Sequence, residues 1–141
     1  MIESYNVIKQ THQGYVLYNQ NDEYVGKSIE NYGDYQLEET KFFNQFIQKG
    51  DVVLDIGANI GTHALWFAKK VGKRGRVLAF EPQRLIFQTL CANMAINSIT
   101  NVDCKQMGVG SVQKLIDLPV LDPTKKANFG GLNIQGHDSG E

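Results

Sequence analysis

Residues 51–62, DVVLDIGANIGT, contain the residue types and the spacing that a cofactor-binding turn needs. The apolar run 52–54 is typical of a fully buried strand, and the acidic Asp55 follows at its carboxyl end. Gly57 and Gly61 then bracket a tight turn, and a helical pattern begins at Thr62. A strand that passes through a glycine turn into a helix directs free backbone N–H groups and the positive helix end toward one ligand.

A second acidic residue, Glu81, ends another apolar run, 76–80, about 20 residues after Gly61. A carboxylate at this place can accept hydrogen bonds from two ribose hydroxyls. The dinucleotide fingerprint G-x-G-x-x-G is not matched, and Asp55 would repel a pyrophosphate but could receive a cationic amino group. A ligand with an adenosine, an ammonium group and a carboxylate fits better, and S-adenosylmethionine has all three.

Four motifs in residues 30–134, DIGANIGTHAL, RVLAFEP, LCANMAIN and NFGG, together resemble the FkbM family of S-adenosylmethionine-dependent methyltransferases. The resemblance implies the class I methyltransferase fold, with the first motif around the methionine part of the cofactor. It also implies that the acid after the second strand binds the ribose and that the segment after the third strand lies beside the adenine. The expected reaction is O-methylation of a sugar, polyketide or similar small-molecule acceptor.

The predicted cofactor-binding residues follow from these motifs, and no catalytic residue is assigned. They are Asp55, Gly57, Ala58, Asn59, Gly61, Thr62, His63, Glu81, Pro82, Gln106, Met107 and Gly108. Asp55 could instead only accept N–H bonds within the turn, and Asn59 either holds the turn or touches the ligand. His63 could meet the cofactor carboxylate or act as a base, although a histidine in a first helical turn is more often packed.

Two interpretations fit Asn128, Gly130 and Gly131 equally. They could flank the cofactor or the acceptor, or they could simply form a turn. The three histidines and two cysteines are too scattered to predict a metal site. Cys91 and Cys104 fall within apolar patterns and are predicted to be two buried free thiols.

The composition is that of one ordinary globular domain, with 141 residues, 42% hydrophobic and 21% charged. A net charge of -1 argues against nucleic acid as a partner. No apolar stretch approaches the ~20 residues of a membrane helix, and the first ten residues do not have the pattern of a secretion signal. The cytoplasm is therefore the expected location.

The order of elements predicts an α/β fold with a Rossmann-like, doubly wound, mainly parallel sheet. The expected helices are 36–48, 62–71 closed by Gly72, and one with Pro82 at its first position that Asn97 stops. The expected strands are 52–54, 76–80 and 102–105. Further along, 112–118 is predicted as a strand, 119–127 as a loop and 129–134 as a short returning strand.

Three regions are expected: a β-rich cap at 1–35, an incomplete cofactor-binding domain at 36–134, and a frayed polar tail at 135–141. The cap contains all six tyrosines and is predicted as one or two hairpins followed by a loop. It could cover the cofactor mouth with Tyr32 or Tyr35 lining the site, or its tyrosines could simply pack against the edge of the core.

Only the first three main strands of the seven-stranded class I sheet are recognisable, so we expect a C-terminally truncated fold resembling an N-terminal fragment. The strand at 52–54 would then form a bare sheet edge, which favours self-association or pairing with another chain. Two alternatives remain open at this point. The chain could be an NAD-dependent oxidoreductase domain with the same topology, or a non-catalytic binding module that retains the fold.

Overall fold

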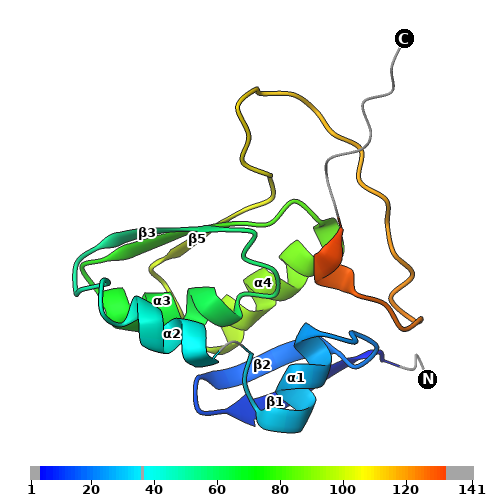
Figure 1. Cartoon of the computed structure of the whole chain (residues 1–141), viewed down its shortest axis with the longest axis horizontal. Coiled ribbons are helices and arrows are strands. Elements are labelled where there is room, and N and C mark those ends of the chain that lie inside the picture. Colours follow the sequence, from blue (N-terminus) through cyan, green and yellow to red (C-terminus); the bar gives the residue numbers. More distant parts are fainter. Residues whose placement is uncertain (1–3, 36, 133–141) are drawn as a thin grey trace.

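The computed structural model describes residues 4–35 and 37–132 (Figure 1). A β-hairpin and a helix come first, followed by a helix and a β-α-β-α-β unit, and a short 3₁₀ helix comes last. The elements are β1 (Asn6–Thr11), β2 (Gly14–Asn19), α1 (Val25–Tyr32), α2 (Leu37–Phe43), β3 (Val52–Ile56), α3 (Thr62–Val71), β4 (Arg76–Phe80), α4 (Arg84–Ile96), β5 (Val102–Lys105) and η1 (Phe129–Gly131). Figure 1 shows the main sheet above a layer of helices, with the hairpin below that layer.

The main sheet is parallel, in the order β3-β4-β5, which confirms the Rossmann-like α/β class. Parallel neighbours need crossover connections, and here α3 and α4 supply them. Both helices lie under the same face of the sheet (Figure 1). Val77 and Ala79 on that face are fully buried, and they belong to two core clusters, Val77 to one around Phe67 and Ala79 to the larger one.

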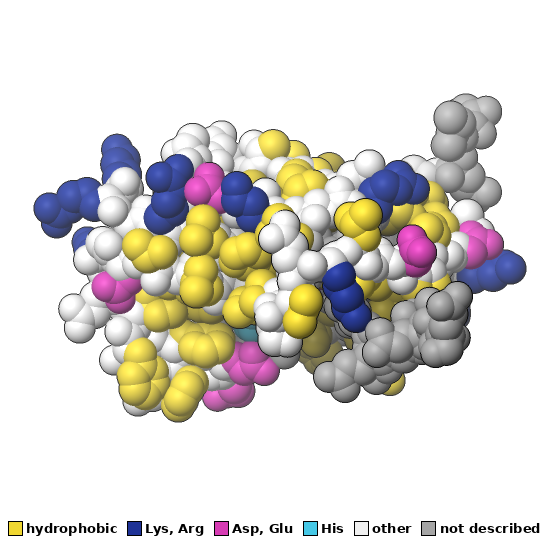
Figure 2. All heavy atoms as spheres, turned by 90° about the horizontal axis from the view of Figure 1, so that it is seen from above, with side chains coloured by type: hydrophobic (Ala, Val, Ile, Leu, Met, Phe, Trp, Pro, Cys, Tyr) yellow, Lys and Arg dark blue, Asp and Glu magenta, His cyan; other side chains and the backbone are white. Residues whose placement is uncertain are grey.

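The opposite face of the sheet is open in the described part of the chain. Val52, Leu54 and Ile56 of β3 are 59–68% exposed because alternate strand residues point away from the helices. Figure 2, which looks down on this face, shows hydrophobic side chains gathered there. The prediction of a fully buried strand at 52–54 is therefore wrong for one face, since helices cover only the other.

Strand β3 is an edge strand of the three-stranded sheet, as expected. In the ranges that the structure describes it pairs only with β4, in the register Val52↔Arg76 to Ile56↔Phe80. The backbone groups on its other side therefore have no strand partner here. Association of this edge with another chain stays a prediction.

The N-terminal hairpin is confirmed, with β1 and β2 antiparallel from Asn6↔Asn19 to Thr11↔Gly14. The loop predicted after it is wrong, because α1 occupies most of that segment. An Asp22 carboxylate oxygen accepts the N–H of Tyr24 at 2.9 Å just before the helix. Val25 and Ile29 are buried on one face of this helix, so tertiary packing stabilises it. The turn-forming residues around it had favoured a loop.

The helix predicted at 36–48 is shorter than expected, and α2 covers only Leu37–Phe43. The chain continues in turns, with the Ile47 N–H bonded to the Phe43 carbonyl at 3.0 Å. Phe43 and Ile47 both pack against the core cluster around Phe67. The apolar residues of this segment therefore reach the core although the helix does not continue through them. Residue 36 lies outside the described residues.

The predictions for α3, β4 and β5 are confirmed at their bounds, including Gly72 at the end of α3. Pro82 is not the first helical residue, because α4 begins at Arg84 with Gln83 in an extended conformation as its N-cap. A carboxylate oxygen of Glu81 holds the Gln83 N–H, which delays the helix by two positions. Asn97 ends α4, as predicted.

The chain after β5 differs most from expectation. Residues 112–118 form no strand, and Leu115 and Val112 are among the most exposed hydrophobic side chains, because none of the described strands lies there to pair with them. The returning strand predicted at 129–134 is wrong in its described part, where η1 buries Phe129 instead. Residues 133 and 134 and the predicted tail at 135–141 lie outside the described residues.

Cys91 and Cys104 are free thiols, as predicted, but both are half-buried where full burial was expected. Burial and the neighbouring Cys91 raise the pKa of the Cys104 thiol to about 12. Among the described helices, none is both long enough and apolar enough to cross a membrane.

Candidate cofactor site

The turn after β3 is tied to the end of β4. The N–H groups of Gly57 and Ala58 both donate to the Phe80 carbonyl at 2.9 Å. Gly57 has a φ of 81° and Gly61 a φ of 90°, values in the left-handed region that favours glycine. The strand-turn-helix predicted from the sequence is therefore present, and backbone hydrogen bonds fix its start.

The end of the turn packs directly against α4. A Cβ built on Gly61 would lie 2.6 Å from Leu90 Cδ1 and 3.0 Å from Met94 Cε. A Cβ on Gly57 would meet nothing within 4 Å. Gly61 is thus required by both backbone angle and space, whereas Gly57 is required by backbone angle alone and borders open space.

Glu81 is buried and holds two backbone groups at once. One carboxylate oxygen accepts the Asn59 N–H at 3.1 Å and the other accepts the Gln83 N–H at 2.9 Å. Burial raises the pKa of Glu81, and these two hydrogen bonds oppose the rise. Glu81 therefore joins the turn to the start of α4, a role that the sequence did not reveal. Each oxygen keeps a second lone pair, so ribose hydroxyls can still donate to it.

Asp55 is also buried, at the end of the neighbouring strand. Burial, and secondly the charge of Glu81, raise the pKa of Asp55 to about 6. Its Oδ2 is buried with no hydrogen-bond partner among the described residues. Buried carboxylate oxygens are normally paired, so this atom fits a cationic donor better than the alternative role of accepting N–H bonds within the turn.

Asn59 holds the turn through its own side chain. Its φ is 52°, and its Oδ1 accepts the Ile60 N–H at 2.7 Å. A Cβ on Gly130 would lie 2.3 Å from Asn59 Nδ2, so η1 rests on this side chain. Of the two roles considered for Asn59, the structure shows the first, and Gly130 is a close-packing position.

The helix α3 begins at Thr62, and its N-cap residue is Gly61. Among the described residues, no side chain forms a capping hydrogen bond at this end. The N–H groups of its first turn are thus not taken by a cap and suit a carboxylate ligand.

His63 packs against two aromatic rings that also contact each other, with centroid separations of 5.7 Å to Phe43 and 5.8 Å to Phe67. Its Nε2 lies 3.4 Å from Glu39 Oε2, and burial lowers its pKa. These contacts favour the packed alternative, while the cofactor and base roles of His63 stay predictions. Within residues 4–35 and 37–132, no group of three or more His, Cys, Asp or Glu side chains could hold a metal ion.

A cavity of about 220 Å³ lies between the start of α4 and the loop after β5. It brings together Pro82 and Gln106, which the sequence predicted as cofactor residues 24 positions apart. Apolar loop residues and the buried Phe129 form much of the remaining wall. Met107 and Gly108, predicted beside them, do not line this cavity, and Met107 is 51% exposed.

Gln83 is a wall residue that sequence reasoning missed. Its Nε2 donates to the Phe129 carbonyl at 2.9 Å, so the bond joins two residues that line the cavity. The sequence signal that could have identified Gln83 is its position two residues after Glu81, a predicted cofactor-binding residue. The contact with Phe129 joins residues 46 apart and could be found only in the folded chain.

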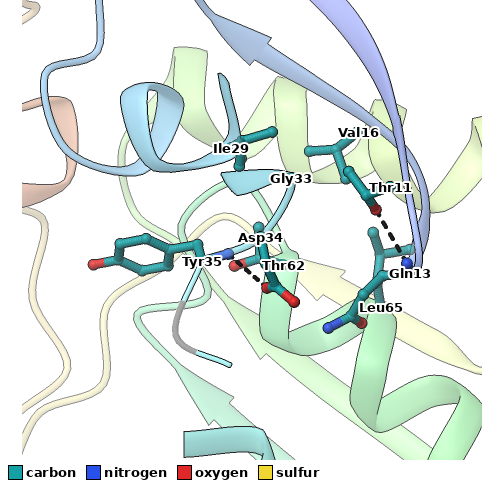
Figure 3. A pocket seen from close by; sticks show the side chains of 9 residues that line it. All are labelled: Thr11, Gln13, Val16, Ile29, Gly33, Asp34, Tyr35, Thr62 and Leu65. Carbon is teal, nitrogen blue, oxygen red and sulfur yellow. Dashed lines mark hydrogen bonds between the residues drawn. The ribbon is translucent and has the colours of Figure 1, made fainter. Parts of the chain in front are cut away.

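A second cavity, shown in Figure 3, lies between the first turn of α3 and the N-terminal hairpin with α1. Its volume of about 10 Å³ is far too small for a metabolite. Tyr35 and Thr62 both line it, so the segment after α1 contacts the start of α3. Tyr32 is 79% exposed and is not part of this wall.

Residues 55–139 match the model of the methyltransferase FkbM domain. The match covers more than half of the chain, which therefore belongs to this family. It includes the glycine turn, Glu81 and the segment after β5.

One curated relative is Methyltransferase 1 of Beauveria bassiana, 34% identical over 58 residues, or 41% of this chain and 23% of the relative. Trm5b from Pyrococcus abyssi has a similar fold, with a TM-score of 0.54 at 19% identity, over 71% of this chain and 27% of that one. A protein described as an rRNA methylase from Clostridium thermocellum gives a TM-score of 0.50 at 21% identity, over 53% and 42%. The chain thus spans about a quarter of the curated relative and less than half of these two solved structures.

Proposed function

We propose that this chain is the cofactor-binding part of an S-adenosylmethionine-dependent methyltransferase. The observation that carries the proposal is the pair of buried acids, Asp55 and Glu81, at the ends of adjacent parallel strands beside a tied glycine turn. The carboxyl edge of a parallel sheet is where ligands of such folds bind. Membership of the FkbM methyltransferase domain family supports the same conclusion.

Each part of the site suits one part of this cofactor. The unpaired Oδ2 of Asp55 would hold the ammonium group, and the uncapped start of α3 would bind the carboxylate. Glu81 would accept the ribose hydroxyls through its remaining lone pairs. The cavity beside Pro82 and Gln106 is of a size that suits a single ring system such as adenine rather than a whole ligand. When bound, S-adenosylmethionine supplies a methyl group activated by its sulfonium, so the task of the protein is mainly alignment.

The acceptor is proposed to be a hydroxyl group of a sugar, polyketide or similar small metabolite. Family resemblance supports this class of acceptor, and a small-molecule partner is compatible with the small net charge of -1. Incubation of the chain with S-adenosylmethionine and hydroxylated metabolites, followed by mass spectrometry, would detect an O-methyl product. Methylation found only on nitrogen or sulfur would contradict this part of the proposal.

Calorimetric titration with S-adenosylhomocysteine tests the cofactor site. We expect micromolar binding by the chain and a loss of at least about tenfold in Glu81→Ala, because a buried charge-assisted acceptor is removed. Glu23→Ala, which changes an exposed glutamate, is the matched control and should bind normally. Circular dichroism must show that Glu81→Ala is folded, since Glu81 also holds the Asn59 N–H. Unchanged binding by folded Glu81→Ala would contradict the assigned site.

Two other functions are separable from this one. An NAD-dependent oxidoreductase domain would be stabilised by NAD in a thermal-shift assay, whereas we expect stabilisation by S-adenosylhomocysteine alone. A non-catalytic module that retains the fold would respond to neither ligand. The absence of the G-x-G-x-x-G pattern opposes the first alternative, and the intact pair of acids opposes the second.

A further inference from the structure

Two asparagines, Asn93 in α4 and Asn97 at its C-cap, take the place of a third strand along the free edge of the hairpin. Asn97 accepts the Tyr15 N–H at 2.9 Å and donates to the Tyr15 carbonyl at 2.6 Å. Asn93 makes the same pair of bonds with Leu17, at 2.6 and 3.0 Å. Four residues of helix rise about 6 Å and two residues of strand about 6.6 Å, so the two repeats match.

Asn93 differs from Asn97 in one contact. Its Nδ2 also donates to the carbonyl of Ile60, at 2.8 Å, so both of its amide hydrogens are used. The Asn93 side chain is completely buried. The other Nδ2 hydrogen bond of Asn97 goes to the Asn93 carbonyl, at the end of α4. One amide thus joins the hairpin to the cofactor turn, and its neighbour one helical turn away holds the hairpin alone.

The bonded carbonyl lies where the turn most needs support. Ile60 is flanked by Asn59 and Gly61, which both have positive φ, so the bonded carbonyl lies between two residues with left-handed backbone. We propose that Asn93 is a positioning residue that fixes the cofactor turn and couples it to the N-terminal hairpin.

This coupling has a functional consequence that rests on the proposed function. Energetic coupling between two sites is reciprocal, so a ligand that orders the turn also strengthens the docking of the hairpin, and loosening the hairpin weakens the ligand. The N-terminal segment then contributes to cofactor affinity through Asn93 without lining the cofactor site.

Amide hydrogen exchange on the full chain, free of ligand, tests the coupling with Asn93→Ala and Asn97→Ala as a matched pair. Both variants should speed exchange in β1 and β2, because each removes two bonds to the hairpin edge. Only Asn93→Ala should speed exchange at residues 57–62. In a parallel titration with S-adenosylhomocysteine, Asn93→Ala should lose about tenfold in affinity and Asn97→Ala much less.

An Asn93→Ala chain whose hairpin loosens while residues 57–62 exchange as before would overturn the proposal. Equal acceleration of the turn by both variants would also overturn it, because the hairpin as a whole and not this amide would then support the turn. The exchange readout needs no ligand, so it stands even if the chain fails to bind S-adenosylhomocysteine.

If Asn93→Ala does not fold, native-state exchange in the unaltered chain decides the question. The proposal expects the amides of Leu17 and Gly61 to open with the same free energy, as members of one cooperative unit. The amide of Tyr15, which Asn97 holds, should open more readily. Opening of Leu17 together with Tyr15, and apart from Gly61, would contradict the proposal.

Discussion

The turn after β3 and the segment after β5 both belong to the candidate site, but the chain holds them very differently. The turn has backbone bonds to β4, a carboxylate bond to Glu81 and close packing on α4. The segment at 106–108 is exposed and has one backbone bond, from the Met107 N–H to the Lys105 carbonyl at 3.0 Å. The comparison teaches that the site is preorganised at its acid-and-turn end, whereas its other end is free to adjust around a ligand.

Substitution of the two turn glycines should break the rigid end most severely. We expect Gly61→Ala to lower the free energy of unfolding by about 2–4 kcal/mol, because it combines a positive φ with overlap against Leu90. Gly57→Ala has the same kind of backbone strain but open space, and should cost about 1–2 kcal/mol. Urea denaturation of both variants measures the difference. Equal losses would mean that α4 yields to the added methyl group.

The pH dependence of stability should reveal the unpaired acid at this end. The pKa of Asp55 is about 6 in the folded chain, above its ordinary value of 3.8. Between these values the folded chain keeps a proton that the unfolded chain has lost, so stability falls as the pH rises from about 4 to about 6. The loss amounts to about 2–3 kcal/mol.

Asn at position 55 cannot ionise, so Asp55→Asn should remove that part of the pH dependence. Relative to the unaltered chain, it should gain stability between pH 4 and pH 7 while losing affinity for S-adenosylhomocysteine. Denaturant titrations at pH 4, 5, 6 and 7 give the two curves. Parallel curves for the two proteins would refute the raised pKa of Asp55.

The open end should tolerate change. Met107→Ala removes an exposed side chain, so the free energy of unfolding should shift by no more than about 0.5 kcal/mol. We expect less than a tenfold loss of affinity for S-adenosylhomocysteine, since an adjustable segment has other atoms to present. A loss of affinity as large as that of Glu81→Ala would show that this end of the site is preorganised to the same degree as the turn.

An equally small effect on stability is expected at Leu54, the neighbour of Asp55 on the opposite, open face of β3. Leu54→Lys should change the free energy of unfolding by about 0.5 kcal/mol or less, because the side chain is 59% exposed. If the β3 edge associates with another chain, this charge should weaken the association in sedimentation experiments. A chain that sediments as a monomer at high concentration, before any substitution, would remove the basis for that association.

The sequence by itself determined the local pieces of this protein. Short runs with apolar residues predicted β4 and β5, and the glycines with the helix-ending Gly72 and Asn97 predicted α3 and the end of α4, because these signals act over a few residues. The order of elements also predicted the parallel sheet, and the motifs predicted which acids would meet at its carboxyl edge.

Only the tertiary structure decided what these pieces contact. The helix α1 was not predicted because its stability comes from burial of Val25 and Ile29. Residues 112–118 have strand-like spacing, but no strand of the described chain lies beside them. The bonds of Glu81 to Asn59 and of Asn93 to Leu17 and Ile60 join residues 22 to 76 positions apart. No local pattern encodes such contacts, because a buried polar group is satisfied by whatever the completed fold brings to it.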